Sequence, residues 1–120
     1  MPITEALSGY VRVPAGTNAV VKYAKIAASS SGDNTIVAAV AGKKIRVLSV
    51  YYLCAGTVTA TWQSGASGTA LSGALAHTAQ TGAVLPHNEN GWFESASGVL
   101  LNLSLNGAIS VAGGLSYIEV

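Results

Sequence analysis

The chain has 120 residues and a formal net charge of +1, and charged residues make up only 9% of it, where about 25% is usual. This length and an apolar content of 50% fit one folded domain with its own core and exclude an intrinsically disordered chain. The small net charge excludes a broad electrostatic footprint for nucleic acid, and no apolar run reaches the roughly 20 residues of a membrane span.

The low charge also bears on how the protein is used. A free monomer of this size normally keeps a well-charged surface to stay soluble. We therefore expect other subunits to cover much of the surface; the alternative is a soluble monomer dressed in serine, threonine, asparagine and glycine. The single cysteine, Cys54, lies in an apolar run and is expected to be a buried free thiol, so no intrachain disulfide is predicted.

In chain order, residues 1–8 are interpreted as an N-terminal arm and residues 9–120 as one domain. Short apolar runs punctuated by 14 glycines predict strands rather than helices. The expected strands cover 9–13, 20–26, 35–40, 44–54, 57–63, 71–75 and 82–85, followed by a hairpin over 99–111 and a last strand over 115–120. About eight strands of this length predict an all-β fold, an antiparallel β-sandwich of jelly-roll or Greek-key type, with a small closed barrel as the alternative.

The run from residue 44 to residue 54 is the longest expected strand and is apolar on both faces. Leu48, Val50 and Tyr52 share one side, while Tyr51 and Leu53 share the other. A strand that is apolar on both faces is expected to be covered on both faces by other parts of the protein or by another subunit. We therefore expect a sandwich core on one face and a subunit interface on the other. The expected interface residues are Leu48, Val50, Tyr52, Tyr10, Ile3 and Leu7.

Two further patterns guide the expected fold. Val58, Ala60 and Trp62 alternate with polar residues, which predicts a half-buried antiparallel strand. Asn106-Gly107 follows an apolar strand and is the preferred pair for a type I′ hairpin turn, because both positions of that turn need positive φ. Gly113-Gly114 is expected to be a bend before the last strand.

Residues that could carry chemistry are few. Glu89 and Glu94 lie beside Trp92 and Phe93, and two carboxylates flanking a sugar bond are what a glycosidase needs. A turn acid and a strand-edge acid are the plainer interpretation. His77 and His87 lack the partners of a metal site. We expect no catalytic residues, no metal, no cofactor and no enzymatic activity.

Two stretches and the chain end carry a family resemblance: Asn34-Thr-Ile-Val-Ala-Ala-Val-Ala-Gly-Lys-Lys-Ile-Arg-Val-Leu48, Gly91-Trp-Phe-Glu-Ser-Ala-Ser-Gly-Val-Leu-Leu-Asn-Leu-Ser-Leu105 and the closing Gly-Leu-Ser-Tyr-Ile-Glu-Val. Together they resemble small β-sandwich cement or decoration proteins from the heads of tailed bacteriophages. The resemblance covers roughly residues 34–120 and concerns turns and strands, so it transfers no functional residue.

The resemblance implies a structural protein on the capsid surface of a virion, assembled in the host cytoplasm. Its expected partners are the major capsid protein and further copies of itself, as a dimer or trimer, with no nucleic acid and no membrane. The alternative is a receptor- or carbohydrate-binding β-sandwich of a phage tail fibre or spike, which Trp92, Phe93 and the tyrosines motivate. A small glycan-active enzyme using Glu89 and Glu94 is a third hypothesis.

Overall fold

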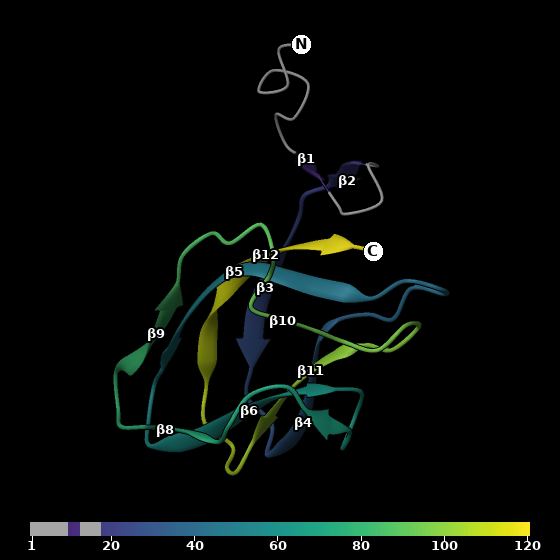
Figure 1. Ribbon diagram of the computed structural model, residues 1–120. Coiled ribbons are helices and arrows are strands. Elements are labelled where there is room, and N and C mark those ends of the chain that lie inside the picture. Colours follow the sequence, from purple (N-terminus) through teal and green to yellow (C-terminus); the bar gives the residue numbers. More distant parts are fainter. Residues whose placement is uncertain (1–9, 13–17) are drawn as a thin grey trace.

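A computed structural model describes residues 10–12 and 18–120, so the expected arm at residues 1–8 lies outside the described residues. Two antiparallel sheets pack face to face, which confirms the expected β-sandwich, and the described residues form strands and turns with no helix (Figure 1). Short apolar runs between glycine-rich turns are too brief for a helix, but they suit strands that bury one face.

We name the two sheets after their central strands. The β5 sheet consists of β3 (Lys22–Ala28), β12 (Val111–Glu119) and β5 (Ile45–Cys54), with β9 (Thr81–Leu85) and β10 (Phe93–Glu94) sharing the far edge of β5. The β6 sheet consists of β4 (Gly32–Val37), β11 (Leu101–Leu105) and β6 (Val58–Ser64), with β7 (Thr69–Ala70) and β8 (Leu75–His77) sharing the far edge of β6. A separate ribbon pairs β1 (Tyr10–Arg12) with β2 (Asn18–Val20).

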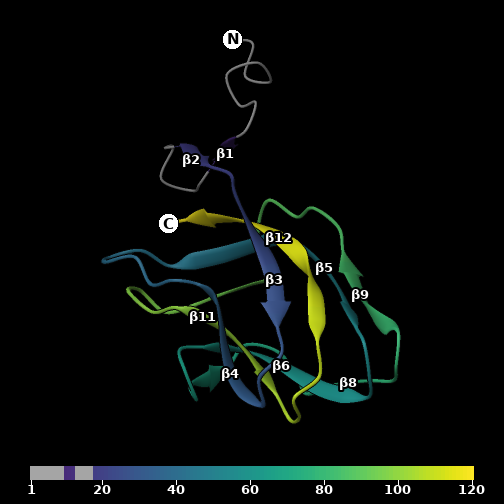
Figure 2. The ribbon, with the colours of Figure 1, turned by 180° about the vertical axis from the view of Figure 1, so that it is seen from behind.

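The connectivity is that of a jelly roll. We count β7 with β8, and β9 with β10, as single interrupted strands. The eight strands that follow the ribbon then change sheet at every connection except the one from the fourth to the fifth strand, and the sheet orders are first-eighth-third-sixth and second-seventh-fourth-fifth. Figure 2 shows the first of these sheets from behind, with β3 and β12 side by side. Two four-stranded sheets wound in this way are one standard solution for closing a sandwich of short antiparallel strands.

The core lies between the sheets and is built by alternation. Val58, Ala60 and Trp62 of β6 are all buried, as the sequence pattern predicts, and Leu101, Leu103 and Leu105 of β11 lie beside them. Trp62 packs edge-on against Tyr52 of the other sheet, with 6.4 Å between ring centroids. The buried Cys54 confirms the expected burial of the thiol, and that burial raises its pKa. The large buried indole of Trp62, at the centre of the core, supplies much of the apolar contact between the two sheets.

A β-bulge divides β5 into two parts. Ser49 pairs with Ser116 and Val47 with Tyr117, so Leu48 has no partner opposite it on β12. The extra residue shifts the alternation, because two residues on one strand then oppose one on its neighbour. Val47 before the bulge and Val50 after it therefore both face the core, while Leu48 packs on the outer side of the sheet.

The expected hairpin at Asn106-Gly107 is wrong. The turn carries the chain from β11 in one sheet to β12 in the other, so the two strands it joins do not pair. Neither residue has positive φ, which a type I′ turn would require. Instead the Asn106 side chain accepts a hydrogen bond from the Thr59 backbone N–H at 2.8 Å. Burial of the apolar face of β12 against the β6 sheet decides the connection, not the turn sequence.

The expected bend at Gly113-Gly114 is also wrong, because both glycines lie inside β12. Their purpose is close approach: a Cβ added at Gly113 would lie 1.9 Å from the Tyr51 carbonyl oxygen. Gly82, on the opposite side of β5, is equally tight against the Tyr52 carbonyl oxygen, at 1.8 Å. Glycine in a strand often marks such a site, where another backbone comes too close for a side chain.

The substitution Gly113→Ala tests this close approach. The added Cβ would clash with backbone atoms of β5, which cannot move aside as the end of a flexible side chain can. We therefore expect the free energy of unfolding to fall by about 1–3 kcal/mol. Chemical denaturation followed by circular dichroism measures the change. Gly107→Ala is the matched control, since a Cβ there meets nothing within 4 Å and φ is ordinary. Equal stability of the two variants would contradict the proposed role of Gly113.

Candidate docking face

The outer surface of the β5 sheet carries most of the large apolar side chains that the described residues expose. Tyr23 is 77% exposed, Tyr51 60%, Leu53 54% and Val84 76%. Backbone pairing brings them onto one face, since Tyr51 lies between Gly114 and Val84 in adjacent strands. We call this surface, defined by Tyr23, Tyr51, Leu53 and Val84, the aromatic face. Contiguous exposed apolar surface of this kind marks interaction sites more often than isolated residues do.

An open hollow of about 670 Å³ lies on the aromatic face. Tyr23 and Tyr51 both line it, and Gly114, Ser49 and Ser116 lie at its floor on β12 and β5. The Tyr51 ring extends across Gly114, because a Cβ added there would lie 3.0 Å from the Tyr51 hydroxyl oxygen. The two serine hydroxyls are hydrogen-bonded to each other. The absence of a side chain at Gly114 leaves the space that the Tyr51 ring covers, so this glycine shapes the hollow.

The outer surface of the β6 sheet is polar instead. Asn102 is fully buried there under a hydrogen-bonded network: its side-chain N–H groups donate to Asp33 at 2.8 Å and to Gln63 at 2.9 Å. Its side-chain oxygen accepts from the Asn34 backbone N–H at 2.8 Å. The hydrogen bonds from Ser67 and Asn102 lower the pKa of Asp33 below its ordinary value. The polar groups on the outer surface of the β6 sheet thus hydrogen-bond to one another and can face water, while the outer surface of the β5 sheet exposes aromatic rings.

The structure corrects the choice of interface residues on β5. Leu48, Val50 and Tyr52 are buried within the chain, at 0%, 1% and 5% exposure, so they belong to its interior. The exposed apolar side chains of β5 are Tyr51 and Leu53, on the face opposite Val50 and Tyr52. Leu48 lies on that outer face too, but Ala19, Val21 and Val120 pack against it. The sequence shows that both sides are apolar, but the bulge at Leu48 and the sheet packing decide which side faces out.

The remaining interface predictions concern the N-terminal part of the chain. Ile3 and Leu7 lie outside the described residues. Tyr10 begins β1, where its backbone pairs with Val20. All three stay predictions. The interface prediction leaves out Tyr23 and Val84, although Tyr23 is among the tyrosines that motivate the carbohydrate-binding alternative. The signal that identifies both is their alternation with partly buried apolar residues, Ala24 on β3 and Ala83 and Leu85 on β9.

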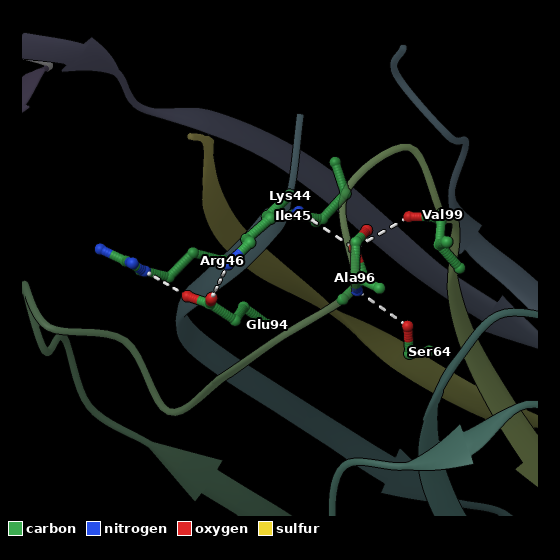
Figure 3. A network of polar contacts seen from close by, with 8 residues as sticks. Lys44, Ile45, Arg46, Ser64, Glu94, Ala96 and Val99 are labelled. Atoms are coloured by element: carbon green, nitrogen blue, oxygen red, sulfur yellow. Dashed lines mark hydrogen bonds and ion pairs between the residues drawn. The ribbon is translucent and has the colours of Figure 1, made fainter. Parts of the chain in front are cut away.

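Charged groups gather at one end of β5, away from the hollow. Glu94 accepts a hydrogen bond from Arg46 at 2.8 Å and lies 3.4 Å from the Lys44 ammonium (Figure 3). Burial raises the pKa of Glu94, but the hydrogen bonds and charges of Arg46 and Lys44 outweigh it and leave the pKa below its usual value. A carboxyl held ionised by two cations is a poor proton donor at neutral pH. This geometry gives no support to Glu94 as the acid of a glycosidase.

The two histidines have different surroundings. His77 of β8 shares a 2.9 Å hydrogen bond with the Tyr52 hydroxyl of the other sheet, and burial raises the pKa of Tyr52 to about 12. The ring of His77 therefore helps to join the two sheets. His87 is exposed and lines the hollow. In the part of the chain that the structure describes, no three histidine, cysteine, aspartate or glutamate side chains gather closely enough to hold a metal ion.

Comparison of the chain with protein-family models, with curated proteins and with solved structures finds no match. Within residues 10–12 and 18–120, no helix has the length and apolarity of a membrane-crossing segment. The aromatic face is consequently the main guide to function that the structure provides.

Proposed function

We propose that this protein is a cement or decoration protein of a tailed-bacteriophage head, which binds major capsid protein subunits through the aromatic face and holds neighbours together. The contrast between the two outer surfaces supports this function most directly. A domain with 9% charged residues concentrates exposed tyrosine, leucine and valine on one sheet and hydrogen-bonded polar groups on the other. A protein that docks through one face onto a larger surface needs apolar side chains on that face and polar groups on the other, because only the contacting face is buried.

The size of the aromatic face suggests that each copy binds weakly. Seven residues along β3 at about 3.3 Å each, across four strands about 4.8 Å apart, give roughly 440 Å² of projected area. A stable interface of standard size uses about 800 Å² per partner. A face of this size therefore suits a protein that acts as many linked copies on a lattice, where avidity adds to modest individual affinity.

Binding to capsids tests the proposal. Capsids of the phage that carries this sequence, prepared without the protein, should bind the wild type and open at a higher temperature when it is bound. Tyr51→Ser should weaken binding about 30-fold, since loss of an aromatic anchor costs about 2 kcal/mol. Sedimentation of capsids with labelled protein measures the binding. Thr59→Ala, on the polar outer face of β6, is the control and should bind normally.

Two results would overturn the proposed function. One is the absence of the protein from purified particles. The other is a folded Tyr51→Ser variant that binds capsids as well as Thr59→Ala does, because the aromatic face would then have no part in docking.

The hollow favours a second candidate function, glycan binding by a tail fibre or spike protein. Two exposed tyrosine rings beside serine hydroxyls and His87 combine an apolar platform with short polar groups, which is the composition of many small-ligand sites. Calorimetric titration with oligosaccharides from the host cell surface separates the two candidates. Binding that Tyr23→Ser abolishes would favour the glycan function, and the absence of any heat together with capsid binding would remove it.

A further inference from the structure

Strand β3 leaves one side of the β5 sheet open. All seven of its residues pair with β12 on one side, and no described strand pairs with its other side (Figure 2). An exposed edge strand presents backbone N–H and C=O groups that can pair with another chain. The length of β3, about 23 Å, is enough to add a full strand of a second molecule.

The other edges offer less. At the start of β4, the Asn34 side chain turns back onto the chain: its oxygen accepts from the Ser29 and Ser30 backbone N–H groups, and its N–H groups donate to the Ser30 and Gly32 carbonyl oxygens. Strands β7, β8 and β10 have two or three residues each, and β9 has five. The edge of β3 is therefore the longest that the described residues leave open for pairing.

The side chains of β3 favour pairing with a second copy in one register. Two antiparallel β3 strands related by a twofold axis at Lys25 would place two lysines opposite each other, which like-charge repulsion disfavours. With the axis at Ala24, Tyr23 of each copy lies opposite Lys25 of the other, on the aromatic face. The ammonium group then meets a tyrosine ring, a favourable cation–π pair that occurs twice in the dimer. With the axis at Ile26, Lys25 would face only Ala27.

We propose that two copies of this chain form a dimer through antiparallel pairing of their β3 strands, with the twofold axis at Ala24. The two β5 sheets then become one continuous sheet, and the two aromatic faces become one surface of roughly 880 Å², close to the standard interface size. The dimer does not depend on the proposed function, but the advantage of the doubled surface rests on it. An isologous contact of this kind closes on itself, so it stops at two copies.

Single-cysteine variants test the register. A residue on a twofold axis of paired strands faces itself, at a Cα separation of about 4.5–5.5 Å, which a disulfide can bridge. Oxidised Ala24→Cys should therefore form a covalent dimer in high yield. Ala27→Cys is the matched control on the same strand and should remain largely uncrosslinked. Cys54 is buried, so the wild type shows the background.

Sedimentation equilibrium tests the dimer without any substitution. The wild type should show a mass near 24 kDa, twice the 12.0 kDa of the chain, as its concentration rises. Tyr23→Ser should raise the dissociation constant about 5- to 30-fold through loss of two cation–π pairs, with an unchanged circular dichroism spectrum. A monomeric wild type at millimolar concentration, or equal crosslinking of Ala27→Cys, would overturn the proposal. A dimer that fails to bind capsids would leave this inference intact and remove the proposed function.

Discussion

Trp62→Ala is expected to lower the free energy of unfolding by about 3–5 kcal/mol, the usual range for removing a large aromatic side chain from a core. Trp62 is 1% exposed and packs against Tyr52 and Phe93, with ring centroids 6.4 and 5.4 Å away. These contacts join both sheets, so the cavity would open at the centre of the sandwich, where neighbouring strands cannot collapse into it. Urea denaturation followed by far-ultraviolet circular dichroism measures the loss without relying on tryptophan fluorescence.

The second tryptophan provides the control. Trp92 is 42% exposed and its indole N–H donates to the Pro86 carbonyl oxygen at 2.8 Å. Trp92→Ala removes an equal volume, but what is lost is a half-exposed surface group and its one hydrogen bond to the Pro86 loop, so we expect a loss of only about 1 kcal/mol. Similar losses in the free energy of unfolding for the two variants would show that Trp62 is not central to the packing of the core.

Asn102→Asp is expected to destabilise the protein by about 3 kcal/mol at pH 7, because it leaves a buried charge without a partner. The substitution replaces an N–H donor by a carboxylate oxygen, next to the Asp33 carboxylate and the Gln63 carbonyl oxygen. Two carboxylates in one site repel, which raises the pKa of the pair in the folded state. Protonation restores a donor, so the stability of this variant should rise as the pH falls from 7 towards 5.

The wild type should respond to acid in the opposite direction. The pKa of Asp33 is lowered in the folded protein, so its contribution to stability is present above the ordinary pKa of 3.8 and is lost as the pH falls through the folded value. Thermal denaturation between pH 3 and 7 compares the two proteins. Asn106→Asp is the control, because an aspartate oxygen can still accept from the Thr59 N–H. A parallel pH dependence for all three would contradict the arrangement of this network.

Some features follow from the sequence because they depend on local pattern alone. The alternation of Val58, Ala60 and Trp62 fixes which side of β6 is buried, since side chains of a strand alternate between its two faces. Glycine-punctuated apolar runs likewise predict the all-β class and favour two packed sheets, while the packing of the sheets excludes the closed barrel. The apolar surroundings of Cys54 are enough to predict its burial.

Other features depend on residues that are distant in the chain. The turn pair Asn106-Gly107 predicts a hairpin, but the strands beside it bury more apolar surface in separate sheets. The run around Tyr51 is apolar on both sides, and only the bulge opposite β12 decides that Tyr51 and Leu53 face outwards while Tyr52 faces the core. A one-residue change of register exchanges the two faces of a strand, and the register is set by the partner strand.

The candidate docking face therefore follows partly from the local sequence pattern and partly from the tertiary structure. The residue pattern is enough to predict a low-charge β-sandwich whose longest strand is apolar on both faces. The place where exposed apolar side chains gather depends on the tertiary structure, because Tyr23, Tyr51 and Val84 come from three strands that only the jelly-roll order brings into one sheet. Close approach of β12 at Gly113 and Gly114 then shapes the hollow between the tyrosines, which no local pattern reveals.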